Sequence, residues 1–139
     1  MTIGMHILTL TTEPCVNESG ELHVHIMQHG DDYYASCTYE PGCLEWEHYG
    51  EKTLNWTVSL SAEWVAQIQH ELGHACIPAM PVFYSGHDGT VYEIGLGDYM
   101  GAATYRWWGT PPQGWEVLGL VHRRIVDRID IPRLVVKPL

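Results

Sequence analysis

The first hundred residues of the chain contain a single cation, Lys52, against fourteen acidic residues. The other Lys and Arg residues fall between positions 101 and 139, and the whole chain has a formal net charge of −10 at pH 7. Nucleic-acid phosphates are bound largely through Lys and Arg, so this deficit argues against direct binding of DNA or RNA. It favours a basic protein partner instead, because complementary charge speeds encounter and suppresses wrong partners.

The sequence also lacks long apolar runs. No stretch approaches the roughly 18 consecutive apolar residues of a membrane-spanning helix, which predicts that nothing spans a membrane. The opening Met-Thr-Ile-Gly-Met-His-Ile has neither the basic nor the apolar region of a signal peptide. We therefore expect a cytoplasmic protein with reduced thiols. No C-x-x-C spacing of a zinc or redox site occurs among its cysteines, which are Cys15, Cys37, Cys43 and Cys76.

The length of 139 residues leaves room for one domain, residues 1–139, and the hydrophobic fraction of 45% is ample for a core. Residues 21–26 alternate between polar and apolar side chains, the pattern of a half-buried strand. Turn residues such as Pro41 and Gly42 separate further segments of this kind. The segments predict an antiparallel meander with strands at 3–10, 21–28, 33–39, 44–49 and 53–60.

Ser61 is expected to cap a helix, with Glu63 in the first turn, where a negative charge is favourable. The apolar residues that follow recur at helical spacing and form one stripe that ends near Cys76. Pro78 and Pro81 cannot continue a helix. The members of the stripe are Trp64, Val65, Ile68, Leu72 and Ala75.

A β-hairpin follows, with strands expected at 82–84, 90–96 and 102–108. Residues 109–112 are expected to open a C-terminal helix, because Pro is favourable near the first turn. Hairpin and helix are expected to cover the sheet. The fold class is therefore α+β, an antiparallel β-meander followed by a helix, a β-hairpin and a C-terminal helix. In the last helix, Trp115, Leu118, Val121, Ile125 and Ile129 are expected to face inward, and Arg123, Arg124 and Arg128 to face water.

The pentapeptide His70-Glu71-Leu72-Gly73-His74 satisfies the pattern H-E-x-x-H. Residues four apart share one face of a helix, so both imidazoles can bind one zinc ion while the glutamate activates a metal-bound water. The pentapeptide resembles the core signature of the zincin metallopeptidases. This resemblance implies that His70 and His74 bind zinc and that Glu71 is the general base.

Other features of this region favour a solvated helix face. In the longer H-E-x-x-H-x-x-G-x-x-H form, Ile77 and Met80 occupy the Gly and the final His positions. A helical wheel places His70 and His74 on the polar side, opposite the apolar stripe. We therefore expect no bound cofactor, with zinc as the alternative. No pattern selects a third ligand among His87, Asp88, Glu93 and Asp98. His23 and His25 share a strand face and could hold a metal, but the alternation of an exposed strand face explains them as well. Five further histidines have no usable spacing, namely His6, His29, His48, His87 and His122.

A second resemblance lies between residues 88 and 115. It is carried by Asp88-Gly89-Thr90-Val91-Tyr92-Glu93, Tyr105-Arg106-Trp107-Trp108, Pro111-Pro112 and Trp115, a pattern similar to one in small uncharacterised bacterial proteins. Some of those proteins are immunity proteins that neutralise partner toxins, so the resemblance implies a role in binding. From the residues themselves, Asp88-Gly89 predicts a tight turn, and Trp108 and Trp115 are expected to join the hairpin to the last helix.

Acidic and aromatic residues are interleaved around the meander. Aromatic anchors surrounded by acids suit a basic protein partner. We expect the partner-binding surface to comprise Asp31, Asp32, Tyr33, Tyr34, Glu45, Trp46, Glu47, Tyr49 and Glu51.

The sequence thus favours a non-catalytic protein of the inhibitor or immunity type. Such a protein would cover a basic surface of its partner, for example the nucleic-acid site of a toxin or nuclease. One alternative is a zinc-dependent hydrolase that uses His70, Glu71 and His74. The other is a structural subunit of a homo-oligomer, with Trp and Tyr side chains buried at the contact, since the sequence leaves the oligomeric state open.

Overall fold

The computed structural model describes residues 4–14, 20–42, 52–80, 89–98 and 101–131. These residues form an antiparallel sheet of six strands and two helices, which is an α+β arrangement. The elements in chain order are β1 (Met5–Pro14), β2 (Glu21–His29), β3 (Asp32–Glu40), β4 (Leu54–Leu60), α2 (Ala62–Gly73), β5 (Thr90–Asp98), β6 (Gly101–Trp108) and α3 (Glu116–Ile129).

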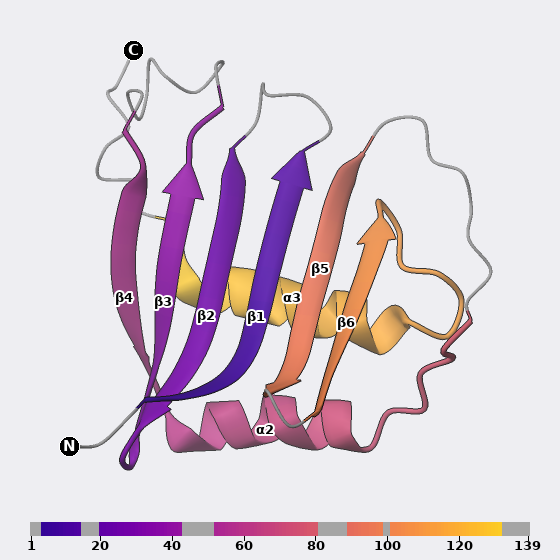
Figure 1. The fold of residues 1–139 in the computed structure, drawn as a ribbon, viewed down its shortest axis with the longest axis horizontal. Helices are drawn as coiled ribbons and strands as arrows, with labels where there is room; N and C mark the ends of the chain where they lie inside the picture. Colours follow the sequence, from indigo (N-terminus) through magenta and orange to yellow (C-terminus); the bar gives the residue numbers. More distant parts are fainter. Residues whose placement is uncertain (1–3, 15–19, 43–51, 81–88, 99–100, 132–139) are drawn as a thin grey trace.

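The strands follow the order β4-β3-β2-β1-β5-β6 across the sheet, so β1 is central (Figure 1). Strands β1 to β4 form an antiparallel meander, as expected, but β4 (Leu54–Leu60) pairs directly with β3, so the strand expected at 44–49 does not lie between them. Strand β5 pairs with the other edge of β1. The expectation that the hairpin covers the sheet is therefore wrong, because β5 and β6 extend the sheet in its own plane. Pairing with β5 satisfies backbone groups along β1 that would otherwise form an exposed edge.

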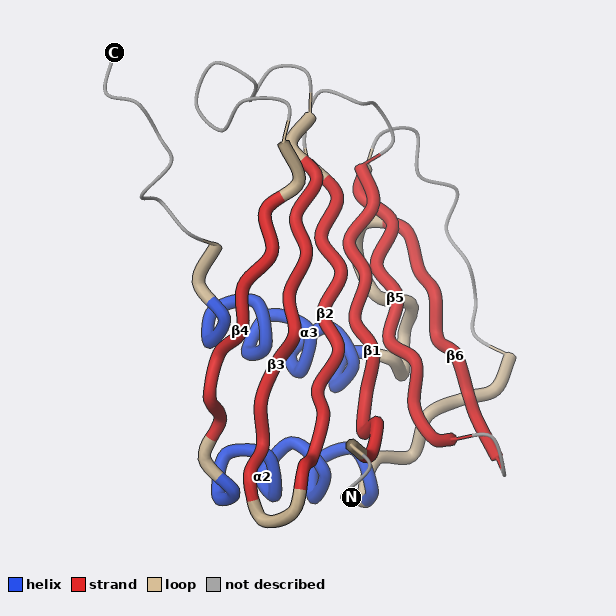
Figure 2. The backbone as a smooth tube through the Cα atoms, turned by 60° about the vertical axis from the view of Figure 1, so that its left-hand side comes forward, coloured by secondary structure: helices blue, strands red, loops and turns tan. Residues whose placement is uncertain are grey.

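Both helices lie on one face of the sheet (Figures 1 and 2). No described helix or strand covers the other face, which we call the open face. The alternation of strand residues decides which side chains point toward the helices. One row of paired residues on the helix-covered face crosses all six strands and is apolar throughout. It consists of Trp56, Cys37, Val24, Leu10, Ile94 and Tyr105.

Local capping explains where α2 begins and ends. The side-chain oxygen of Ser61 accepts a hydrogen bond from the backbone N–H of Trp64 at 3.1 Å, which confirms the expected N-cap. Val65 and Ile68 are buried, as the apolar stripe predicts. The helix ends at Gly73 and not near Cys76, because the backbone at the next residue leaves the helical region.

The C-terminal helix α3 buries the residues that the sequence assigned to the core. Leu118, Val121, Ile125 and Ile129 are each at most 2% exposed, and Trp115 immediately before the helix is 5% exposed. The helix begins at Glu116, later than expected from residues 109–112. Gly114, with φ of +93°, is the physical reason, since this backbone conformation interrupts a helix. Of the arginines expected to face water, Arg123 and Arg128 are exposed, whereas Arg124 is half-buried.

A different tryptophan from the one expected joins the hairpin to α3. Trp107, and not Trp108, packs edge-to-face against Trp115, with ring centroids 6.5 Å apart. Tyr105 makes a second edge contact with Trp115 at 5.4 Å. Strand alternation decides this, because Tyr105 and Trp107 point to the helices and Trp108 points to the open face, where 44% of its surface is exposed.

The expected strands at 44–49 and 82–84 lie outside the described residues. Within the described part of the chain, neither helix combines the length and the apolar character that crossing a bilayer requires.

Candidate functional site

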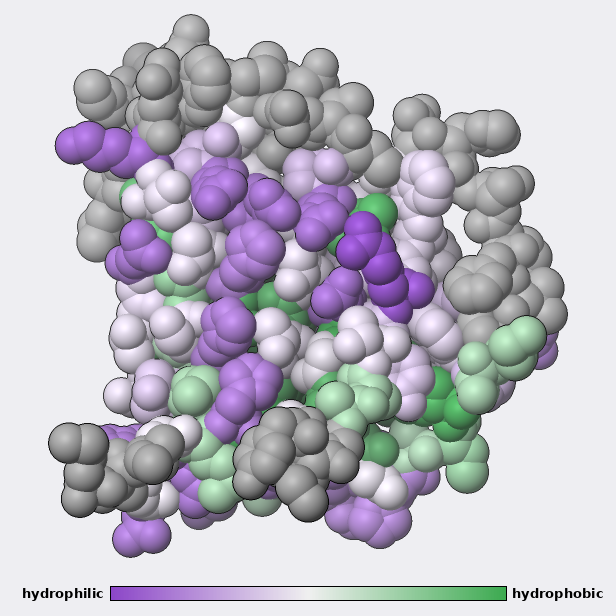
Figure 3. All heavy atoms as spheres, in the orientation of Figure 1, coloured by the Kyte–Doolittle hydropathy of each residue, from purple (hydrophilic) through white to green (hydrophobic). Residues whose placement is uncertain are grey.

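The open face of the sheet carries a row of three glutamates on neighbouring strands. Glu21 of β2 lies directly opposite Glu40 of β3. Thr12 pairs with Leu22, so the next residue of β1, Glu13, continues this row beside Glu21. We call Glu13, Glu21 and Glu40 the acidic row. Figure 3, which views this face, shows hydrophilic side chains gathered over the strands.

The register extends the acidic row to an exposed aromatic ring. Glu13 pairs with Val91 of β5, and Val91 pairs with Trp108 of β6. The indole of Trp108 lies against Gly89, where an added Cβ would come within 2.9 Å of the ring. The ring of Trp108 therefore lies close to the backbone at Gly89, and Trp108 is 44% exposed.

Charges on this face are unevenly balanced. Arg106 binds two carboxylates, Glu93 at 3.1 Å and Glu13 at 3.3 Å. Glu21 contacts the imidazole of His23 at 3.4 Å, which is an ion pair when the imidazole is protonated. No ion pair reaches Glu40 among the described residues. The acidic row is therefore only partly neutralised by the protein itself.

Three histidines, His6, His23 and His25, lie near one another on β1 and β2, farther along these strands from the acidic row. The Nδ1 atom of His25 lies 3.4 Å from Nε2 of His6, and Thr9 also contacts His6 at 3.0 Å. Partial burial, and then the proximity of His6 and His23, lower the pKa of His25 from its usual value. Within the described residues, no three His, Cys, Asp or Glu side chains are arranged to hold a metal ion.

The structure describes part of the partner surface that the sequence predicts. Asp31 and Asp32 are exposed at the turn between β2 and β3, at the opposite end of these strands from Glu21 and Glu40. Tyr34 faces the open side, whereas Tyr33 packs against the core under the helices. The remaining predicted residues, Glu45, Trp46, Glu47, Tyr49 and Glu51, lie outside the described residues.

The H-E-x-x-H segment forms the C-terminal end of α2. His70 and His74 are exposed, as the helical wheel predicts, and their rings pack with centroids 4.0 Å apart. His74 caps the helix and donates a hydrogen bond from Nδ1 to the carbonyl oxygen of His70 at 2.9 Å. The described residues bring no third donor to this pair.

Glu71 contacts a residue that the sequence pattern did not suggest. Its carboxylate forms an ion pair with Arg124 of α3, and Arg124 also donates to Gln67 at 3.4 Å. Arg124 thereby links the two helices. The carboxylate of Glu71 is therefore held in an ion pair between α2 and α3.

Burial raises the pKa of the Cys37 thiol to about 11, so this thiol is protonated at pH 7.

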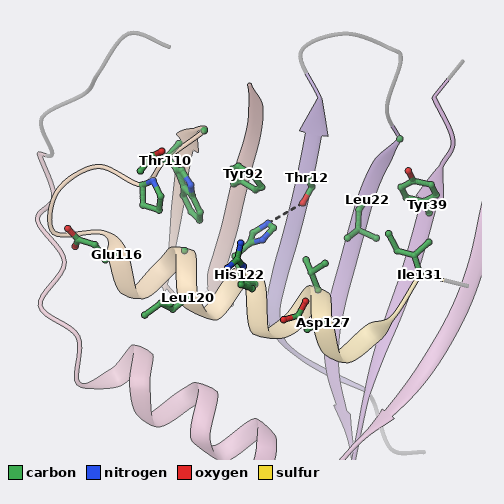
Figure 4. Close-up of a pocket in the computed structure, with 17 residues that line it drawn as sticks. Thr12, Leu22, Tyr39, Tyr92, Thr110, Glu116, Leu120, His122, Asp127 and Ile131 are labelled. Carbon is green, nitrogen blue, oxygen red and sulfur yellow. Dashed lines mark hydrogen bonds between the residues drawn. The ribbon is translucent and has the colours of Figure 1, made fainter. Parts of the chain in front are cut away.

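A large cavity lies on the other face of the sheet, between the strands and α3 (Figure 4). Its volume is about 700 Å³. Thr110 and Glu116 lie at one end of it, and Tyr39 and Ile131 at the other. Much of the wall is apolar or aromatic, formed by Leu22, Tyr39, Tyr92, Trp107, Val126 and Ile131.

His122 projects from α3 into this region and is 5% exposed. Its Nε2 lies 3.1 Å from the hydroxyl of Thr12 and 3.5 Å from the carbonyl oxygen of Thr11. The ring makes edge contacts with Tyr92 and Trp107 at centroid distances of 4.8 and 5.9 Å. Burial lowers the pKa of His122 to about 4, against the opposing effect of the hydrogen bond to Thr11, so the imidazole is neutral at pH 7.

Comparison of the chain with known protein families, curated proteins and solved structures finds no match.

Sequence reasoning missed both the acidic row and His122. The members of the acidic row belong to three strands, so only the pairing register brings them together. His122 and Thr12 are 110 positions apart in the sequence. The one available signal for the row was the alternation of residues 21–26, which places Glu21 on the polar side of its strand.

Proposed function

We propose that this protein is a non-catalytic acidic binding protein of the inhibitor or immunity type. It covers a basic surface of a protein partner with the open face of its sheet. The observation that carries the proposal is the acidic row, in which Glu21 lies directly opposite Glu40 with Glu13 beside it. An array of carboxylates on a rigid sheet presents a fixed pattern of negative charge to cationic side chains of a partner.

The arrangement of the acidic row is unfavourable for the isolated fold. Like charges directly opposite each other on neighbouring strands destabilise a sheet. Local rules of this kind are broken mostly at functional sites, where another gain offsets the cost. A cationic partner would supply that gain, because its charges would relieve the repulsion between Glu21 and Glu40.

Trp108 gives the proposed interface an aromatic anchor at the end of the row. Tryptophan and arginine are enriched among the residues that dominate binding energy, and a guanidinium stacks well on an indole ring. The half-exposed ring of Trp108 on Gly89 is therefore suited to an arginine of the partner.

Two double variants with the same change in net charge test this proposal. Glu21→Gln/Glu40→Gln removes two charges from the acidic row, and Asp31→Asn/Asp32→Asn removes two from the far end of the same strands. The probe is a fluorescein-labelled arginine-rich peptide, measured by fluorescence anisotropy at low and moderate salt. We expect the first variant to weaken binding roughly tenfold and the second by less than about twofold. Salt screens the attraction between distant charges more than that between charges in direct contact, so the difference should persist at moderate salt.

Trp108→Ala is a third variant, which keeps the charge unchanged and should also weaken binding. Equal losses for the two double variants would show that the peptide responds to net charge alone and would refute the assignment to the acidic row. A greater loss for the Asp31 and Asp32 variant would move the interface to the turn between β2 and β3.

A further inference from the structure

The cavity beneath α3 has the dimensions of a small-molecule site. It lies on the opposite face of the sheet from the acidic row and has no part in the proposed function. Its volume of about 700 Å³ falls within the range of roughly 300–1,000 Å³ that is common for ligand pockets. Tyr92 and Trp107 stack with centroids 5.7 Å apart and planes tilted by 24°, which gives the cavity a broad aromatic wall.

One ring atom of a lining residue, Nδ1 of His122, has no hydrogen-bond partner among the described residues. The Nε2 atom of His122 is engaged by Thr11 and Thr12, but no hydrogen bond reaches its Nδ1 in the described part of the chain. The carbonyl oxygen of Thr11 can only accept, so it favours the tautomer with the proton on Nε2. Nδ1 is then a bare acceptor in a ring that is 5% exposed, and buried acceptors of this kind are normally hydrogen-bonded.

The charges around the cavity favour a neutral occupant. Among the described residues that line the cavity, the charged ones are Arg123, Glu116 and Asp127, and all three are exposed. A charged ligand buried among the aromatic side chains would lose its hydration without gaining a counter-ion. His122 cannot serve as that counter-ion at pH 7, because its imidazole is neutral.

We infer that this cavity is a binding site for a neutral, planar aromatic molecule that donates one hydrogen bond to Nδ1 of His122. The aromatic side chains of Tyr92 and Trp107 in the wall favour an aromatic occupant. A hydrogen-bond donor on the ligand would fix its orientation, because it would supply the bond to Nδ1 that the described residues do not make.

Three naphthalene probes test the inference, each titrated into the full chain by isothermal calorimetry at pH 7. The probe 2-naphthol offers a hydroxyl donor, 2-methoxynaphthalene has the same ring without a donor, and 2-naphthoate is an anion. We expect 2-naphthol to bind about fivefold more tightly than 2-methoxynaphthalene, the effect of one hydrogen bond, and 2-naphthoate to bind most weakly.

Variants of α3 locate the binding. Val126→Phe fills the cavity and should abolish binding of both neutral probes. Val117→Phe is the matched control, because Val117 is also partly buried on α3 but does not line the cavity, and it should bind like the wild type. His122→Leu should lower the affinity for 2-naphthol to that for 2-methoxynaphthalene and leave the latter unchanged.

The His122→Leu result does not depend on whether Val126→Phe folds, which circular dichroism would establish. Undiminished binding by folded Val126→Phe, equal affinities of the wild type for the two neutral probes, or tightest binding of 2-naphthoate would each overturn the inference. None of these outcomes bears on the acidic row, so this inference and the proposed function can fail separately.

Discussion

The two faces of the sheet carry different kinds of side chains, although the same alternating strands form both. The helix-covered face buries apolar rows and a neutral histidine, and α3 on that side carries three arginines. Among the described strand residues, the open face carries four glutamates, Glu13, Glu21, Glu40 and Glu93, and one arginine, Arg106. One face therefore supplies the core, and the core does not dictate the arrangement of the charged side chains on the other, which is the face that we propose for recognition.

Neighbouring residues of β2 give the largest expected contrast between the faces. Ile26 is 2% exposed on the helix-covered side, and His25 is exposed on the other. Ile26→Ala removes buried methyl groups and leaves a cavity, so we expect it to lower the free energy of unfolding by about 2–5 kcal/mol. His25→Ala should change it by no more than about 0.5 kcal/mol. Urea denaturation measures both, and similar losses would show that the open face also contributes to the core.

The pH dependence of stability tests the covered face through His122. Its pKa is about 4 in the folded protein, below the usual 6.5, so the unfolded chain binds the proton more readily between these values. The contribution of His122 to the free energy of unfolding is then fully present above pH 6.5. It falls by about 3 kcal/mol as the pH drops toward 4. His25 contributes with the same sign, because its pKa is also lowered.

His122→Leu provides the comparison for this prediction. Urea denaturation of both proteins from pH 7 to pH 4 should show a smaller acid loss in the variant, since the leucine has no proton to bind. Parallel curves for the two proteins would mean that the imidazole is already protonated, or accessible to protons, in the folded state.

The sequence predicted what depends on local pattern. The alternation along β2 and the helical spacing along α3 each identified the buried residues correctly, because the repeat of a strand or helix decides which side chains share a face. It did not predict the placement of β5 beside β1, which depends on which strand edge is left unpaired. The partners of Glu21 and His122 follow from that long-range pairing, so the acidic row and the cavity could not be read from spacing.

The smallest predicted effect is also the sharpest test of the open face. Because Glu40 lies opposite Glu21, Glu40→Gln removes one of two like charges on directly paired residues and should raise the free energy of unfolding by about 0.2–1 kcal/mol. Glu93→Gln is the matched control on the same face. It breaks the ion pair with Arg106, so it should leave stability unchanged or lower it by up to about 1 kcal/mol. Urea denaturation at low salt would reveal the difference, and added salt should reduce it by screening. A loss of stability in Glu40→Gln would mean that the fold itself requires this carboxylate, which would remove the reason to assign the acidic row to a partner.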